Sequence, residues 1–503
     1  MVVSTDVNPS LTLDSTTGMP AETEKATIVG EGPLSQQTTS STDIEDQVIP
    51  IESDAFGNEE GAEIQYKTCK WWQVNTGILM LAENVSLGVL ALPQALAILG
   101  LVPGILCICL LGVIATYTGY LIGEFKLAHP SVQSYADCGT LISGPILHEV
   151  LAVGQVLVLI FIMGAHILTF GVAMNAITDH GTCTIIFTVI GLVLSFLLGL
   201  PRTFKNISYI SFFCKMKSGV RNGNAHADEH VACASVILGV TITMVAIGIQ
   251  KPNMGNIVAV RPDVPLVQGI SPVMNIVLAY SGHVAFFSFA SELQDPREFR
   301  KALFFEQGVA VGFYMLISAV IYYYAGPDIA SPALGSASPL ISKICFGIAL
   351  PTIIVAGVVN GSVAIKYVYL RIWKGTDVVH TNSWKSLGSW WAICTVAWLA
   401  SWILAEAIPN FNLLLGLIGA LFGSWFSYAL PPLLWLWHNH INDMSFVSKR
   451  HTLFTIFHCL LVVLGLAIFG LGMWSSGWAL HHGSGGKVFS CENNWHAASW
   501  VAE

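Results

Sequence analysis

The residues best suited to chemistry form a short polar cluster inside an apolar stretch. Residues 83–93 read ENVSLGVLALP, within a run from about 71 to 101 that is long enough to cross a membrane. Gly88 and Pro93 weaken a helix, and the side chains of Asn84 and Ser86 compete for its backbone hydrogen bonds. We therefore predict a helix that breaks within the membrane, which is tolerated only where the backbone faces protein or a wet cavity.

Such a break exposes backbone groups that can bind a small zwitterion. Unpaired N–H groups near Leu87, Gly88 and Val89 would bind a carboxylate, and freed carbonyl groups would bind an ammonium group or a cation. Gly88 would supply unusual backbone angles and let a substrate approach closely. A packing glycine next to a proline kink is the other interpretation of this pattern.

A second polar cluster resembles the first. Residues 279–296 read AYSGHVAFFSFASELQDP. Two interrupted helices in corresponding places of two five-helix halves are typical of inverted-repeat transporters. Tyr280 and Phe286 would line an apolar side-chain pocket. The candidate substrate-binding residues are Asn84, Ser86, Leu87, Gly88, Val89, Tyr280, Ser281, Gly282 and Phe286.

Glu83 and His283 are the candidates for proton coupling. A carboxyl group deep in a membrane span is costly and usually faces a polar interior. Glu83 would either carry a proton or hold two helices together as a hydrogen-bonded acid. His283 can titrate in the working pH range, although an intramembrane histidine can equally be a hydrogen-bonded packing residue. His166 and Asn360 are further polar groups predicted within the membrane.

Composition places the chain among polytopic membrane proteins. Of 503 residues, 54% are hydrophobic and 11% are charged, whereas a soluble domain carries about 25% charged residues. We predict an all-α fold of eleven spans, at about 72–97, 99–124, 146–178, 183–200, 206–250 (interrupted), 266–290, 302–325, 345–372, 389–408, 411–437 and 453–475.

The connections between these spans predict the orientation. With the N-terminus in the cytoplasm, the cytoplasmic connections are much richer in Lys and Arg than the outer ones. Lys366, in the eighth span, is expected to reach the cytoplasmic face, and Glu292 and Asp295 to make helix-end or gate contacts. The outer basic residues are Lys251, Arg261, Lys343 and Lys487, against thirteen on the cytoplasmic side.

The chain divides into three predicted parts. Residues 1–66 form a disordered acidic cytoplasmic tail, residues 67–476 the transmembrane domain, and residues 477–503 a short extracellular tail. We expect no cleaved signal peptide. Most cysteines should be buried small residues, and a disulfide between Cys183 and Cys491 is left open. We find no metal-binding, cofactor-binding or nucleophile motif. We therefore expect that the protein is not an enzyme, and we expect no nucleic-acid partner.

These motifs resemble a known family. Residues 84–93 resemble the NxxGxGILxLP signature of the amino acid/auxin permease family, and residues 280–296 resemble its span-six signature. Residues 201–210 and 417–436 resemble the fungal neutral amino acid permease branch. The resemblance covers about residues 67–475 and implies a LeuT-type fold, with a 5+5 inverted repeat plus one helix. Ser86 departs from the family pattern, since it replaces the first glycine of the signature.

The expected function is secondary active transport. The resemblance implies proton-coupled import of amino acids, with an amino acid, protons and membrane lipid as partners. The uncharged cluster at 280–283 favours neutral side chains. We expect the plasma membrane, with the vacuole as an alternative compartment. A non-transporting amino acid sensor that signals through the acidic tail is the rival function.

An anomalous polar segment interrupts the fifth span. Residues 215–232 carry five charges and two histidines and have no counterpart in the family. They are either a genuine loop, with the helix starting at Cys233, or a translated intron. We favour the intron, because the codons for 214–232 can begin with GTAAAATG and end with TAG.

Deleting residues 215–232, with Cys214→Ser at the junction, should restore one continuous helix. The deleted form should reach the membrane in larger amounts and transport faster, because each charge at the centre of a span costs about 2.5–3.5 kcal/mol. Membrane expression and amino acid uptake of both forms measure this. Equal transport by the two forms, with abundant transcripts that retain the segment, would show that the loop is genuine.

Overall fold

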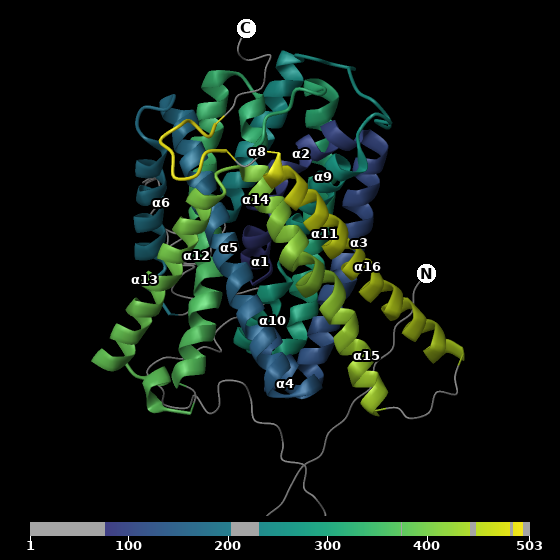
Figure 1. Ribbon diagram of the computed structural model, residues 1–503, viewed down its shortest axis with the longest axis vertical. Helices are drawn as coiled ribbons and strands as arrows, with labels where there is room; N and C mark the ends of the chain where they lie inside the picture. The colour runs from purple at the N-terminus through teal and green to yellow at the C-terminus, as the bar shows by residue number, and fades with distance from the viewer. Residues whose placement is uncertain (1–75, 203–230, 374, 443–448, 483–485, 496–503) are drawn as a thin grey trace, which may run out of the picture. The chain divides into compact units, whose positions relative to one another are not determined.

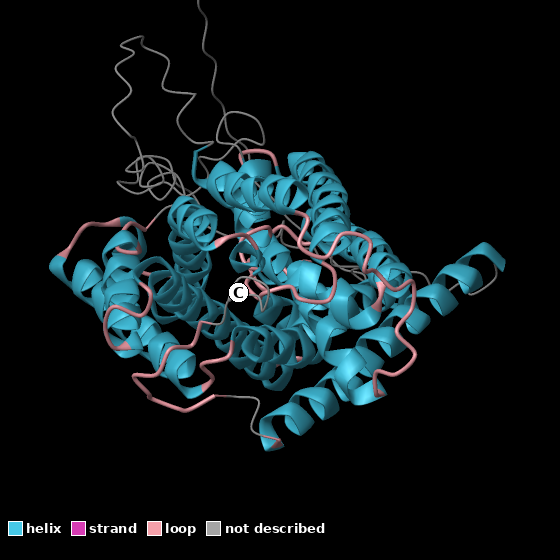
Figure 2. Ribbon diagram, turned by 90° about the horizontal axis from the view of Figure 1, so that it is seen from above, coloured by secondary structure: helices cyan, strands magenta, loops and turns pink. Residues whose placement is uncertain are grey.

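The computed structural model describes residues 76–202, 231–373, 375–442, 449–482 and 486–495. Within these ranges the chain is helical and contains no β-strand (Figures 1 and 2). The predicted acidic tail and almost all of the polar segment at 215–232 lie outside the described residues. The fifth span is therefore seen only from Val231, where its helix begins.

The predicted helical spans are present. Among the described residues, eight helical units are long and apolar enough to cross a membrane, and three shorter apolar helices accompany them. In chain order the spans are α1 (Thr76–Asn84) with α2 (Gly88–Leu99), α3 (Leu101–Ala128), α5 (Pro145–Thr178), α6 (Thr184–Leu198), α8 (Val231–Gln250), α9 (Leu266–Ala279) with α10 (His283–Glu292), α11 (Phe299–Ala325), α12 (Pro339–Trp373), α13 (Trp384–Ala407), α14 (Phe411–Ile418) with η5 (Gly419–Ala429) and α15 (Leu430–Asn442), and α16 (Lys449–His481).

The outer helices expose large apolar side chains. Leu110 on α3, Val396 on α13 and Leu460 on α16 are each 60–69% exposed. By contrast, most of α5, α12 and the α9–α10 unit is buried. Apolar faces of this extent are stable in lipid rather than in water. The chain is thus a multi-pass integral membrane protein.

Both predicted helix breaks are confirmed. Residues 85–87 form a turn between α1 and α2, and residues 280–282 separate α9 from α10. The two broken units lie inside the bundle (Figure 1), where α2 packs against α9 and α1 packs against α11 and α12. The breaks are therefore enclosed by protein, as backbone at membrane depth requires.

The tenth span adds an irregular segment beside the second break. Its middle part, η5, is a π-helix, a conformation that occurs frequently at functional sites. Gly423 of η5 leaves so little room that a Cβ atom there would lie 2.6 Å from the Ser281 hydroxyl oxygen. The small residues of η5 thus allow this helix to lie directly against the second break.

One sequence expectation proves wrong. Lys366 of α12 does not extend to the membrane surface, since it is only 4% exposed and forms an ion pair with Glu292 of α10. The ammonium group can remain buried because a buried carboxylate compensates its charge. Glu292 makes a contact between two helices near one end of the bundle, in line with its predicted role.

The described C-terminal segment is tied to the bundle at the opposite end. Cys183 and Cys491 form a disulfide with a Cα–Cα distance of 4.4 Å, the pairing that the sequence left open. Next to it, Thr184 donates a hydrogen bond to the Glu492 carbonyl oxygen at 2.7 Å. The segment near residues 486–495 is thus held against the ends of α5 and α6.

Candidate functional site

The site begins where the two helix breaks contact one another. Gly88, the first residue of α2, lies so close to α9 that a Cβ atom there would be 2.6 Å from the Ala279 Cβ and 2.7 Å from its Cα. Gly88 is not among the residues with positive φ. Glycine is therefore required here for close packing of the two breaks rather than for an unusual backbone angle.

A tyrosine of α11 joins the same two breaks. The Tyr314 hydroxyl lies 3.0 Å from the Asn84 carbonyl oxygen and 3.1 Å from the Ala279 carbonyl oxygen. These are the carbonyl groups at the ends of α1 and α9, which lack partners within their own helices. Because a hydroxyl has one proton, it donates to one of the two carbonyls at a time.

A small cavity lies beside this contact and is lined by residues of both breaks. Its volume is about 30 Å³, which is room for a water-sized molecule but not for an amino acid. The breaks are therefore closed together in this conformation. Residues from α1, α2, α5, α9, α14 and the connecting turns line it, namely Glu83, Asn84, Leu87, Gly88, Ile162, Ala165, His166, Leu278, Ser281 and Ile418.

The predicted residues of the first break lie at or beside this cavity. Asn84, Leu87 and Gly88 line it. Leu87 is the N-cap of α2 and makes no side-chain capping hydrogen bond, so no side chain occupies the helix N-terminus. Ser86 faces α5, where its hydroxyl lies 3.1 Å from the His166 Nε2. Val89 is fully buried within α2.

The predicted residues of the second break divide into two groups. Ser281 lines the cavity, and Gly282 lies against the first break, where a Cβ atom would be 2.8 Å from the Glu83 Oε2. Tyr280 and Phe286 are not among the lining residues. The Tyr280 ring packs on that of Tyr314, with centroids 5.3 Å apart.

The two proton-coupling candidates lie in different surroundings. Glu83 lines the cavity and interacts with the side chain of Asn360 on α12. His283 faces α3 instead, where its Nε2 lies 2.9 Å from both the Thr118 hydroxyl and the Ala115 carbonyl oxygen. The structure therefore does not bring the two candidates together.

Sequence reasoning missed one titratable residue of the site. Glu306 of α11 is fully buried, and its Oε1 accepts a hydrogen bond of 2.6 Å from the Asn84 side-chain amide. A carboxyl group inside the predicted span 302–325 was the signal that could have identified it. The apolar lining residues, such as Ile162 and Ile418, carry no such signal.

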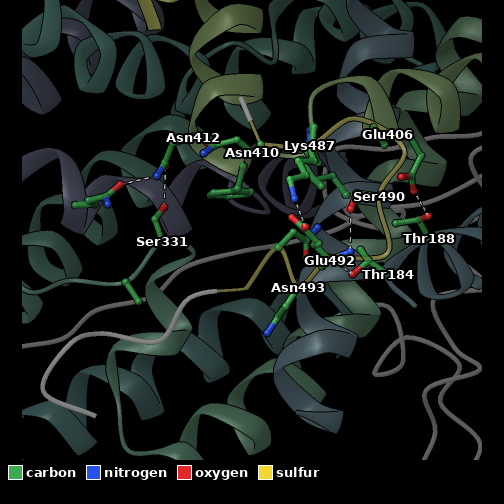
Figure 3. A pocket seen from close by; sticks show the side chains of 18 of the residues that line it. Thr184, Thr188, Ser331, Glu406, Asn410, Asn412, Lys487, Ser490, Glu492 and Asn493 are labelled. Carbon is green, nitrogen blue, oxygen red and sulfur yellow. Dashed lines mark hydrogen bonds and ion pairs between the residues drawn. The ribbon is translucent and has the colours of Figure 1, made fainter. Parts of the chain in front are cut away.

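A larger cavity lies next to the first, toward the C-terminal segment. Its volume is about 560 Å³, within the range of small-molecule sites. The two cavities share α5, because Leu168 lines the larger one and Ala165 the smaller. Figure 3 shows its polar wall, where the Ser331 hydroxyl donates to the Asn412 Oδ1 at 2.7 Å. Gln94 of α2 also lines it and accepts from the Asn412 amide.

Comparison with known sequences gives one consistent family. The profile of the family described as "Transmembrane amino acid transporter protein" matches residues 67–476. The chain is 33% identical over 427 residues to the N amino acid transport system protein of Neurospora crassa, covering 82% of this chain and 87% of that protein. It is 29% identical to a transmembrane transporter of Gibberella moniliformis, covering 92% and 97% respectively.

A solved structure shares the fold. The crystal structure of MhsT in complex with L-phenylalanine aligns with a TM-score of 0.51 at 12% identity, covering 80% of this chain and all of that one. MhsT has the LeuT fold. The resemblance-based expectation of a LeuT-type architecture is confirmed, and at this identity the likeness concerns the fold alone.

Gly88→Ala should reduce amino acid uptake by about tenfold or more. The added methyl group would meet the Ala279 backbone, and overpacking of this kind costs about 1–3 kcal/mol. Uptake is normalised to the amount of protein in the membrane. The matched control is Gly312→Ala on α11, where an added Cβ meets nothing within 4 Å. Wild-type uptake by a well-expressed Gly88→Ala protein would contradict the role given to this contact.

Proposed function

The chain belongs to the transmembrane amino acid transporter family, and from this premise we propose that it imports neutral amino acids by proton symport. The observation that carries the proposal is the pair of opposed helix breaks with a cavity between them. Each break presents a helix N-terminus and a helix C-terminus at the same depth. This arrangement offers backbone donors and acceptors together, as the two charged ends of an amino acid require.

The substrate would be held mainly by the backbone. Its carboxylate would meet N–H groups near Leu87, Gly88 and Val89, where the N-terminus of α2 has no side-chain cap. Its ammonium group would meet carbonyl oxygens at the ends of α1 and α9. Two of these, on Asn84 and Ala279, are the alternative acceptors of the Tyr314 hydroxyl. Tyr314 can therefore release one carbonyl while it remains bonded to the other.

The walls of the cavity favour a neutral side chain. Ile162, Ala165, Leu278 and Ile418 are apolar, and no Lys or Arg is among its described lining residues. An anionic side chain would find no cationic partner there and would face the Glu83 carboxyl group. A cationic side chain would have to leave water for a mostly apolar wall, which is costly.

The two ends of the bundle support an alternating-access cycle. The larger cavity lies at the end held by the Cys183–Cys491 disulfide. Disulfides persist in oxidising compartments, so this end would face the cell exterior or, in the alternative location, the vacuolar lumen. The Glu292–Lys366 pair lies in the opposite half and would have to separate or move before release on that side. We assign that side to the cytoplasm, with the N-terminus.

Purified protein in proteoliposomes should accumulate labelled neutral amino acids when the outer pH is lower than the inner pH. A gradient of one pH unit can drive about tenfold accumulation per proton. A panel of neutral, acidic and basic amino acids, assayed with and without the gradient, measures both selectivity and coupling. Binding without any transport would favour the sensor function instead.

Glu83→Gln should abolish accumulation driven by a pH gradient but preserve exchange of substrate across the membrane. The amide keeps the size of the side chain and its contact with Asn360 but cannot carry a proton at this site. Both activities are measured in the same proteoliposomes. Concentrative uptake at the wild-type level would show that Glu83 is only a packing residue, and His283 would then be the remaining candidate for proton coupling.

A further inference from the structure

We propose that Glu306 of α11 is the second half of the proton site, and that Glu83 and Glu306 bind one proton between them. The inference rests on the proposed proton symport and deepens it. It adds a coupling residue from a different helix and links the proton to the substrate site through Asn84. The argument depends on how the two carboxyl groups are placed and on which groups surround them.

The two carboxyl groups lie on either side of one asparagine. Asn84 follows Glu83 in α1, and its side-chain amide donates to the Glu306 Oε1 at 2.6 Å. Asn84 thus contacts Glu306 and neighbours Glu83 in the chain, and the Glu83 charge acts on the Glu306 carboxyl group. Glu83 is 8% exposed and Glu306 is fully buried. Two carboxylates that act on each other out of water repel, so the pair favours holding one proton.

No cation of the described chain compensates the pair. The side chains that act on the two carboxyl groups are Asn360 for Glu83, and Asn84 and Gln307 for Glu306, all of them uncharged. Lys366, on the same helix as Asn360, is already paired with Glu292. A buried carboxylate without a cation is expensive, which again favours a bound proton.

Three buried acceptor atoms of the pair and its neighbour Asn360 lack hydrogen-bond partners within the described part of the chain. The Oε2 atoms of Glu83 and Glu306 have no hydrogen-bond partner among the described residues, and neither does the Asn360 Oδ1. Asn360 is 1% exposed, and its amide nitrogen is engaged by the Ala356 carbonyl oxygen at 3.0 Å. An amide oxygen can only accept a hydrogen bond. Because Glu83 interacts with the Asn360 side chain, a proton on the Glu83 carboxyl group would offer a donor to this buried oxygen.

The other titratable groups of this region make their contacts with other elements. On α5, His166 is bonded to Ser86 and to its own helix. On α10, the Nε2 of His283 is bonded to α3, while its Nδ1 has no partner among the described residues. On α11, Tyr314 donates to the carbonyl groups of the breaks, and Tyr280 packs on its ring. Within the described chain, none of these groups is bonded to Glu83 or Glu306, and we therefore assign the proton to the carboxyl pair itself.

Asn84 connects this unit to the substrate site. Its side chain holds Glu306, while its backbone carbonyl is one of the two acceptors of Tyr314 at the breaks. Loss of the shared proton would leave two repelling carboxylates across the α1–α11 contact. The resulting displacement acts on the carbonyl groups assigned to the substrate ammonium. In the proposed cycle the proton enters with the substrate from the exterior and leaves to the cytoplasm.

The test compares Glu306→Gln, Glu83→Gln, the double variant and the control Glu124→Gln in proteoliposomes. Glu124 of α3 is a partly exposed carboxylate paired with Arg300 of α11, away from the breaks. The new amide at position 306 can still accept from Asn84, which preserves the contact. For Glu306→Gln we expect the roughly tenfold accumulation per pH unit to be lost, exchange to persist, and exchange to become independent of pH. The double variant should be no worse than either single variant, because the two residues act as one unit.

Each outcome decides between the possibilities. Wild-type accumulation by Glu306→Gln, or a double variant that combines two independent defects, would overturn the shared site while leaving proton symport intact. A wild-type protein driven by sodium and not by pH would instead refute the proposed symport and the proton site with it. If Glu306→Gln fails to reach the membrane, Glu306→Asp decides, since a retained carboxyl group should preserve pH-driven accumulation. Loss of that accumulation in a well-folded Glu306→Asp protein would count against the proposal.

Discussion

The contact between the two helix breaks is the constraint on which the rest of the site depends. An interrupted helix in a membrane leaves backbone groups that lipid cannot satisfy. Here each interruption is covered by the other, because Gly88 has no side chain and lies directly against Ala279. The Tyr314 hydroxyl then lies within hydrogen-bond distance of a carbonyl oxygen on each side and donates to one of them at a time. These are the backbone groups to which we assign substrate binding in the proposed function.

Glu292, Glu83 and Glu306 are buried carboxyl groups in two kinds of surroundings. Glu292 is compensated by Lys366, and this pair ties α10 to α12. Glu83 and Glu306 have uncharged neighbours and share Asn84 between them. A compensated pair acts as a contact between helices, whereas an uncompensated pair can change its charge only by taking or losing a proton. This contrast is why we propose a proton-binding role for Glu83 and Glu306 and not for Glu292.

The two cavities differ in size and lie at different distances from the end that carries the disulfide. The cavity of about 560 Å³ lies beside the disulfide-held C-terminal segment, and the cavity of about 30 Å³ lies between the breaks. Residues of α5 line both cavities. In the proposed cycle, a conformation that joins them would let the substrate reach the breaks while the Glu292–Lys366 pair stays closed on the other side.

The sequence by itself determined the spans and the two breaks, because both follow from local composition: long apolar runs, and glycine, proline and small polar residues within them. It also identified Glu83, Asn84, Gly88 and Ser281, which line the central cavity. Only the tertiary structure decided which side chains turn toward that cavity. The contacts that build the site join residues more than 200 positions apart in the sequence, such as Asn84 with Glu306 and with Tyr314. Helical periodicity does not show which helix packs against which face. The roles of Glu306 and Tyr314 in the site, and the contact of His283 with α3, can therefore be seen only in the packed bundle.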